Sequence, residues 1–188
     1  MVVPQPAVDP ATNNGRPSEF SIGIGIGYLF PTSLETPNIT SVRFRLPAGL
    51  TFEPQVILAN TTQTVDTGMP VDNKTTEVGL GTVIRYPLIG RGRVDLELLG
   101  AFNINNVKQN PPGDDDETST TTTSLTYGLA VTSWITRHWQ ISLTAANPVL
   151  SFTKVRQEMG VMNVLVQSQT TFGAIFDPTV ALMVHLYH

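Results

Sequence analysis

Large apolar residues alternate with small or polar residues along most of the chain from Phe20 onward. In segment 19–30, apolar side chains occupy every second position, and serine or glycine fills most positions between them. A period of two predicts a β-strand, because a helical stripe would repeat every 3.6 residues. Three glycines on one face, Gly23, Gly25 and Gly27, are expected to leave room for larger neighbours on the concave side.

The same alternation predicts seven further strands. Their apolar residues span 42–46, 50–58, 78–86, 94–104, 125–135, 139–143 and 172–186. Short turns are expected at 47–49, 89–92 and 137–138, and longer polar loops at 60–74, 106–123 and 154–168. Short turns that alternate with longer loops are typical of outer-membrane barrels, with all short turns on one rim.

Composition favours lipid as the environment of these strands. Charged residues make up 14 % of the chain, against roughly a quarter in soluble domains, and mean hydropathy is near zero at +0.04. No run of 18 apolar residues is present, so a transmembrane helix is not expected. Apolar residues spread by alternation through a charge-poor chain indicate a β-barrel that faces lipid.

The charged residues of the predicted strands all lie on the face opposite the apolar series. They are Arg43, Arg45, Glu53, Glu77, Arg85, Arg93, Asp95, Glu97 and Asp177. Because a charge facing lipid at mid-membrane costs roughly 2–4 kcal/mol, we assign the apolar face to lipid and the charged face to the interior. We therefore predict an all-β, eight-stranded antiparallel up-and-down transmembrane β-barrel over 19–188, with short periplasmic turns and longer extracellular loops. The proline-rich segment 1–18 is expected to be a flexible tail.

The short turns predict which interior charges meet. Arg43 should lie opposite Glu53, and Arg85 near Asp95 or Glu97. With Arg45 these residues form a mixed-charge lumen cluster. An eight-stranded barrel is just wide enough for side chains to fill. The cluster is therefore either a structural plug or a gate that opens when ion pairs exchange partners.

Four cations, Lys74, Lys108, Lys154 and Arg156, map to the rim of the longer loops. One interpretation is that they are solvated ends of loops. The other is that they contact phosphates of lipopolysaccharide in the outer leaflet, which attract cations at that level.

Three prolines, Pro54, Pro148 and Pro178, fall within predicted strands, where proline cannot donate a ladder hydrogen bond. Pro148 and Pro178 map to similar heights on neighbouring strands, so a shared local irregularity is predicted there. Trp134 is an exception among the aromatic residues near strand ends, because its parity points inward near the short turns.

Over residues 19–188 the chain resembles the small outer-membrane barrels, the OmpA transmembrane-domain and OmpX-like group. The resemblance rests on the number of strands, the alternation of short turns with longer loops, the parity of the lipid face and the inward Arg43/Glu53 cluster. The resemblance implies insertion by the barrel-assembly machinery, with an anchoring, adhesion or small-pore role. We expect the protein to be a monomer. That group usually ends in an aromatic residue, whereas here Tyr187 precedes His188. The first six residues have neither the basic region nor the apolar core of a signal peptide, so we expect that the signal has been removed.

Enzymatic chemistry is not expected. The chain has no cysteine, and its histidines, His138, His185 and His188, map to the short-turn rim. We therefore expect no catalytic residue, metal site or cofactor, with His185 as a lumen hydrogen-bonding group and the acidic run 114–117 as part of a mobile loop. A net charge of −4 argues against nucleic acid as a partner.

Three functions stay open. The first is a non-enzymatic structural or surface-interaction barrel in contact with outer-membrane lipid and lipopolysaccharide. The second is a narrow gated channel for ions or small solutes. The third is a soluble lipocalin-like ligand-binding barrel, which would need an apolar interior and a polar exterior.

Overall fold

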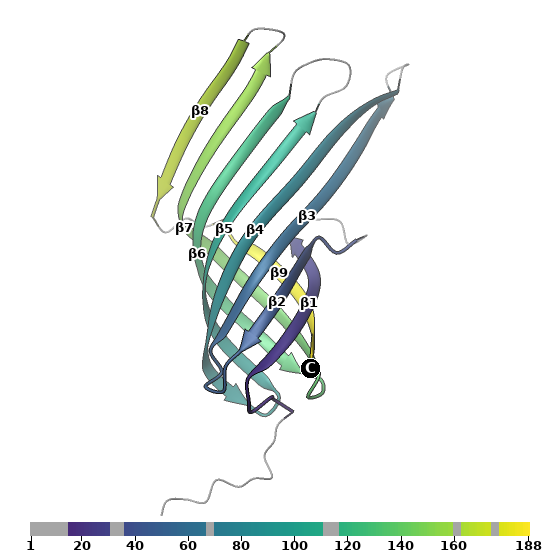
Figure 1. The fold of residues 1–188 in the computed structure, drawn as a ribbon. Coiled ribbons are helices and arrows are strands. Elements are labelled where there is room, and N and C mark those ends of the chain that lie inside the picture. The colour runs from purple at the N-terminus through teal and green to yellow at the C-terminus, as the bar shows by residue number, and fades with distance from the viewer. Residues whose placement is uncertain (1–14, 31–35, 67–69, 111–116, 160–162, 174–176) are drawn as a thin grey trace, which may run out of the picture.

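The computed structural model describes residues 15–30, 36–66, 70–110, 117–159, 163–173 and 177–188, which form an antiparallel sheet (Figure 1). Its strands are β1 (Ser21–Phe30), β2 (Ile39–Arg45), β3 (Thr51–Asp66), β4 (Pro70–Arg91), β5 (Val94–Asn110), β6 (Thr118–Trp134), β7 (Trp139–Met159), β8 (Asn163–Phe172) and β9 (Thr179–Tyr187). Within these ranges, no helix is long and apolar enough to cross a membrane.

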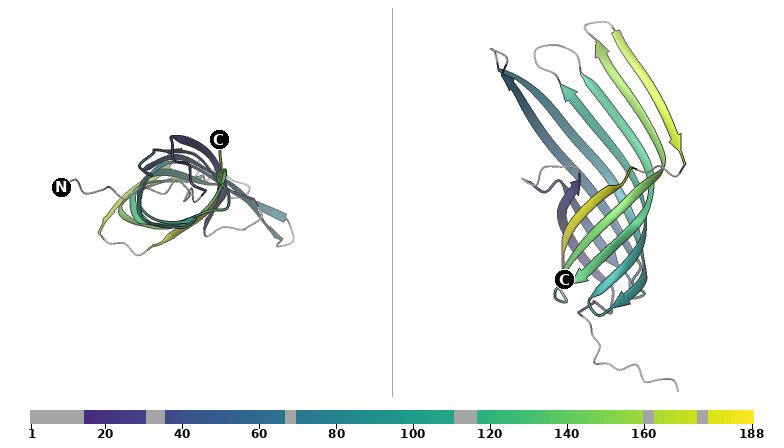
Figure 2. Two further views of the ribbon diagram at one scale, coloured as in Figure 1. Left: turned by 90° about the horizontal axis from the view of Figure 1, so that it is seen from below. Right: turned by 180° about the vertical axis from the view of Figure 1, so that it is seen from behind.

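Eight of the strands close into a ring. Each strand from β1 to β7 pairs with the next, and β9 closes the ring by pairing with both β7 and β1 (Figure 2). Strands of the ring that follow one another in sequence are thus neighbours in the sheet, as in an up-and-down barrel. The predicted fold class is confirmed, with one difference: the strand predicted over 172–186 corresponds to β9, and a further strand, β8, precedes it in a stretch predicted mostly as loop.

The point at which β7 changes its partner from β9 to β8 coincides with the two prolines predicted to share an irregularity. β7 pairs with β9 through residues 139–146 and with β8 through residues 150–159. Between these segments, a register shift opposite β6 lies next to Pro148, and Pro178 lies just before β9. The prediction is confirmed. Pro54 behaves differently, since it pairs with Thr82 of β4 without a register shift.

The polar stretches predicted as loops are mostly strand, so this part of the prediction is wrong. Residues 60–66 and 70–74 belong to the β3–β4 hairpin, 106–110 and 118–123 to β5 and β6, and 154–159 and 163–168 to β7 and β8. Both faces of these segments are polar or mixed, so alternation gives no signal, although threonine favours strands. The sheet therefore rises well beyond the ring on one side (Figure 1).

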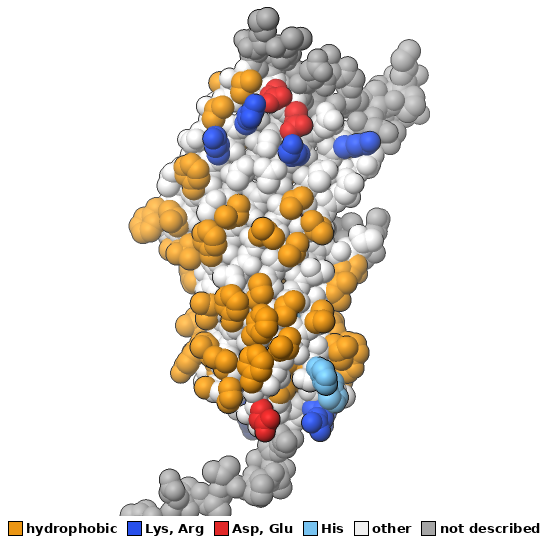
Figure 3. All heavy atoms as spheres, in the orientation of Figure 1, with side chains coloured by type: hydrophobic (Ala, Val, Ile, Leu, Met, Phe, Trp, Pro, Cys, Tyr) orange, Lys and Arg blue, Asp and Glu red, His pale blue; other side chains and the backbone are white. Residues whose placement is uncertain are grey.

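The two faces of the ring have opposite chemistry, as predicted. Large apolar side chains point outward and are exposed, as at Ile24 (70 %) and Leu80 (62 %), whereas Arg43 and Glu53 are buried in the interior. The outward side chains form a belt around the lower and middle part of the molecule (Figure 3). This is the reverse of a soluble lipocalin, whose exterior is polar, and it suits a barrel surrounded by lipid.

Two of the charges assigned to the interior lie elsewhere. Arg93 is exposed in the turn between β4 and β5, and Asp177 is exposed before β9 begins. Both lie next to strand ends, where parity no longer fixes the direction of a side chain. Residues 1–14 of the expected tail, residues 114–116 of the acidic run and Phe176 lie outside the described residues.

Candidate functional site: the barrel lumen

The β2–β3 hairpin brings the first predicted ion pair together. Gly49 adopts a positive φ of 85°, and the amide of Leu46 donates to the carbonyl of Leu50 at 2.9 Å, which closes the turn. The resulting register pairs Phe44 with Phe52, and so places Arg43 level with Glu53. The Arg43 Nη2 to Glu53 Oε2 distance is 2.7 Å, which confirms the prediction.

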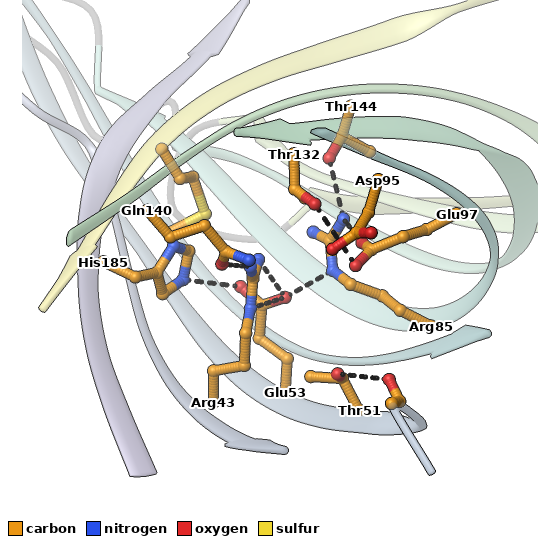
Figure 4. Close-up of polar contacts among 12 residues, drawn as sticks. Arg43, Thr51, Glu53, Arg85, Asp95, Glu97, Thr132, Gln140, Thr144 and His185 are labelled. Atoms are coloured by element: carbon orange, nitrogen blue, oxygen red, sulfur yellow. Dashed lines mark hydrogen bonds and ion pairs between the residues drawn. The ribbon is translucent and has the colours of Figure 1, made fainter. Parts of the chain in front are cut away.

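Glu53 is the centre of the lumen cluster (Figure 4). Its Oε2 accepts hydrogen bonds from Arg43 and, at 2.7 Å, from Nε of Arg85. Its Oε1 lies 3.2 Å from Nε2 of both Gln55 and His185. Four side chains from β2, β3, β4 and β9 therefore meet at one buried carboxylate, which links opposite sides of the ring.

Arg85 extends the cluster to the far wall. Its Nη1 lies 3.6 Å from Glu97 Oε2 and donates to Thr144 Oγ1 at 3.1 Å. The Glu97 alternative of the prediction is thus confirmed. The Asp95 alternative is wrong, because Arg85 pairs with Leu99, which is two residues from Glu97 but four from Asp95.

Asp95 belongs instead to a separate layer at the short-turn rim. It lies 2.6 Å from Nη2 of Arg16 and accepts a hydrogen bond from Trp134 Nε1 at 3.3 Å. The guanidinium of Arg45 lies 5.5 Å from the centre of the Trp134 ring, a cation–π distance. Arg45 thus lies in this layer, and the inward orientation predicted for Trp134 is confirmed.

Sequence reasoning missed several members of the cluster. Gln140 accepts a hydrogen bond from Arg43 Nη1, and Thr132 donates to Glu97 at 3.4 Å. Both are inward by parity and fully buried, so a search for neutral polar residues on the charged face would have found them. Arg16 lies in a segment without alternation, and no pattern in the sequence indicates its contact with Asp95.

His185 is buried and forms hydrogen bonds, as predicted, in an arrangement unlike a catalytic relay. Its Nε2 lies 3.0 Å from Ser41 Oγ and 3.2 Å from Glu53 Oε1, while its Nδ1 is buried without a partner among the described groups. A serine–histidine–acid relay needs the hydroxyl and the acid on different ring nitrogens. No group of three or more His, Cys, Asp or Glu side chains in the described ranges could hold a metal ion.

The four rim cations lie on the outer surface of the tall sheet. Lys74 of β4, Lys108 of β5, and Lys154 and Arg156 of β7 are all exposed. Lys108 pairs with Glu117 at 3.0 Å and Arg156 with Glu158 at 2.8 Å. Figure 3 shows cations and acidic groups gathered just above the apolar belt.

No family model matches the chain, and no curated protein matches it. Among solved structures, the fold is similar to Ail, the attachment invasion locus protein of Yersinia pestis, at 15 % identity and a TM-score of 0.46, covering 90 % of this chain and 99 % of that one. The structure of Ail in complex with the heparin analogue sucrose octasulfate is similar at 16 % sequence identity and a TM-score of 0.45, covering 90 % of this chain and 99 % of that one. Neisserial surface protein A (NspA) is similar at 13 % sequence identity and a TM-score of 0.43, covering 89 % of this chain and 96 % of that one.

Proposed function

We propose that the chain is a non-enzymatic barrel of a bacterial outer membrane that holds an extended sheet above the membrane for interaction with a surface partner. The observation that carries this proposal is the continuation of β3 to β8 beyond the apolar belt. Only the part of the sheet within the belt is needed to cross the membrane, and the rest is placed where it can meet other molecules. Insertion by the barrel-assembly machinery and a monomeric state belong to the same proposal.

The edge of the tall sheet supports an interaction role. β8 is the last strand in the sheet order, and its pairing within the described residues is with β7. Its residues 164–172 are exposed, including Val164 (54 %) and Val166 (50 %). An unpaired edge presents N–H and C=O groups that an extended peptide can bind by adding a strand. We therefore assign the interaction to this edge.

The lumen supports a structural role below the sheet. The cluster around Glu53 connects β2, β3, β4 and β9 by buried ion pairs and hydrogen bonds. Filled lumens of this kind suit small barrels that act as anchors. In this proposal the cluster is a plug, and the gated channel is the competing outcome of a conductance measurement.

The topology can be tested with single cysteines, because the natural chain has none. In cells that express the protein, Ser168→Cys in β8 should react with a membrane-impermeant maleimide from outside. Arg137→Cys, in the turn between β6 and β7, is the matched control and should react only after the outer membrane is permeabilised. Labelling of Arg137→Cys but not Ser168→Cys in intact cells would contradict the proposal.

We further propose that Lys74, Lys108, Lys154 and Arg156 contact phosphates of lipopolysaccharide. Their exposure supports this, as does the pairing of neighbouring strands, in which Ser119 lies opposite both Lys108 and Arg156. The exposed ion pairs that two of the cations form contribute little stability of their own. Replacing all four by glutamine should weaken the effect of added lipopolysaccharide on resistance to heat denaturation. Replacing Arg91 and Arg137 at the other rim is the control, and an equal loss in both sets would exclude a specific contact.

A further inference from the structure

A cavity of about 290 Å³ lies in the lumen beyond the charged cluster, on the side of the tall sheet. The inward side chains of the ring strands build its wall, and Arg85 and Gln55 separate it from the ion pairs around Glu53. Its size is near the lower end of the range of roughly 300–1,000 Å³ found for small-molecule sites. The cavity is thus large enough for a compact organic molecule.

The wall is divided between an apolar part and a neutral polar part, in contrast to the ionic part of the lumen. The polar part includes Asn103, Thr122, Ser124, Thr126 and Thr179. Two apolar clusters contribute to the apolar part, one around Val83 and Leu99 and one around Ile39 and Ile57. The cavity stays open where the wall has short side chains, at Ala101, Ala146 and Ala181. Water is held poorly against this apolar part of the wall, because it needs several polar partners. An apolar body would therefore be favoured over water along this wall.

The polar part of the wall offers a free acceptor. Asn105 donates through Nδ2 to Glu77, while its Oδ1 is buried without a hydrogen-bond partner among the described residues. This oxygen lies over Gly79, where a Cβ would come within 3.1 Å of it. A buried acceptor without a partner is costly, and a ligand N–H or O–H would satisfy it.

The charge of the wall indicates a neutral ligand. Arg85 is the one charged residue among the described residues that line the cavity. Its guanidinium already contacts Glu53, Glu97 and Thr144. A charged ligand would have to give up its hydration without a counter-ion free to receive it.

We propose that this upper cavity binds a small neutral amphiphile, a compact apolar molecule of about the size of indole with one hydrogen-bond donor. The apolar body lies against the wall formed by Ile39, Ile57, Val83 and Leu99, and the donor binds Oδ1 of Asn105. This function is separate from the interaction assigned to the edge of β8.

The test uses the full chain in lipid nanodiscs, with methyl groups of isoleucine, leucine, valine and alanine labelled for NMR, and indole as the probe. Methyl signals of Ile39, Ile57 and Leu99 should shift and saturate as indole is added. Lipid-facing Ile24 and Leu80 report indole dissolved in the bilayer and should shift without saturation. The proposal would be overturned if the lumen methyl signals did not shift, or if they shifted without saturation as the lipid-facing methyl signals do.

Variants separate a cavity site from indirect effects. Ala101→Phe fills the cavity and should weaken binding of indole at least tenfold, whereas Ala145→Phe makes the same change on the exposed outer face and should leave it unchanged. Asn105→Ala should weaken binding about threefold to tenfold, the range of one hydrogen bond. Ala181→Leu replaces Ala101→Phe if that variant does not fold. The proposal would be contradicted if Ala101→Phe bound indole as tightly as the unchanged protein does. It would also be contradicted if the unchanged protein bound the anion indole-3-acetate as tightly as indole.

Discussion

Glu53 is the residue on which the buried polar side chains of the lumen converge. It faces two arginines, Arg43 and Arg85, at 2.7 Å, and both guanidinium groups are almost entirely shielded from solvent. Buried charges are tolerated only when they are paired and hydrogen-bonded. The stability of the ring should therefore depend more on this carboxylate than on any exposed ion pair.

Replacing Glu53 by glutamine should destabilise the folded barrel strongly. The substitution keeps the shape of the side chain but leaves two buried arginines without their common counter-ion, a change that costs about 3–5 kcal/mol. Unfolding by urea in lipid vesicles, followed by tryptophan fluorescence, measures the free energy. Glu117→Gln, which breaks the exposed pair with Lys108, is the control and should change it little. If both variants lose the same stability, the cluster does not have the role assigned to it.

The glycine stripe of β1 has a specific steric cause. Gly23, Gly25 and Gly27 lie directly opposite inward residues of β9, in the pairs Gly23–Tyr187, Gly25–His185 and Gly27–Met183. A Cβ on Gly25 would approach His185 Nε2 to within 2.3 Å and Ser41 Oγ to within 2.7 Å. The expectation that these glycines leave room for larger neighbours is confirmed. The room is used by the residues that close the ring.

Gly25→Ala should therefore destabilise the barrel, by the roughly 1–3 kcal/mol typical of overpacked interiors. Gly100→Ala is the matched control, because the nearest atom to its Cβ is 4.0 Å away. The two variants can be compared by the temperature at which the folded band disappears in unheated gel samples. Equal temperatures would mean that His185 moves aside freely and that the contact does not constrain the strand.

At the scale of elements, β8 and β9 share one partner but have different roles. β9 pairs on both sides, since Val184 lies opposite Ile26 of β1 and Ile141 of β7. β8 lies outside the ring and pairs with β7, as at Val166 with Arg156. The ring can be closed without β8, which extends the sheet above it.

Proline substitutions should separate these two roles. Val184→Pro removes a donor from a strand whose pairing is continuous on both sides and should abolish the folded form. Pro54 is tolerated in β3 because the pairing with β2 is interrupted there, between Gln55 and Phe52. Val166→Pro should leave insertion and the folded gel band intact while disturbing the β7–β8 hairpin. Loss of the folded band in both variants would show that β8 is needed for closure.

The sequence predicts the ring well because the membrane imposes a strict pattern. Lipid on one side and a crowded lumen on the other force every second residue to be apolar, so strand faces, short turns and the Arg43–Glu53 pair all follow from parity. The prediction fails where that constraint ends. The extensions of β3 to β7 have no apolar alternation, and the bulge after Pro87 changes the register by one residue near the turn, which parity does not predict. The position of Arg16 depends on tertiary contacts alone.

At the scale of the whole molecule, the barrel has three parts stacked along its axis. A floor of Arg16, Asp95, Arg45 and Trp134 lies at the short-turn rim, the ion pairs around Glu53 come next, and the apolar cavity follows beneath the tall sheet. The first two parts fill the lumen with paired charges and packed rings. A path for ions would have to displace both, which is why we expect the lumen to be closed.

Planar-bilayer recordings test that expectation directly. The refolded protein should insert without discrete openings, and Arg85→Ala should behave in the same way, because Arg43, Gln140 and His185 remain packed around Glu53. Lys108→Ala, an exposed change above the belt, is the control for unrelated effects on insertion. Openings in the natural protein that become larger or more frequent in Arg85→Ala would instead identify a gate whose ion pairs exchange partners. The lumen would then conduct, and the barrel would have to be reassigned as a narrow channel.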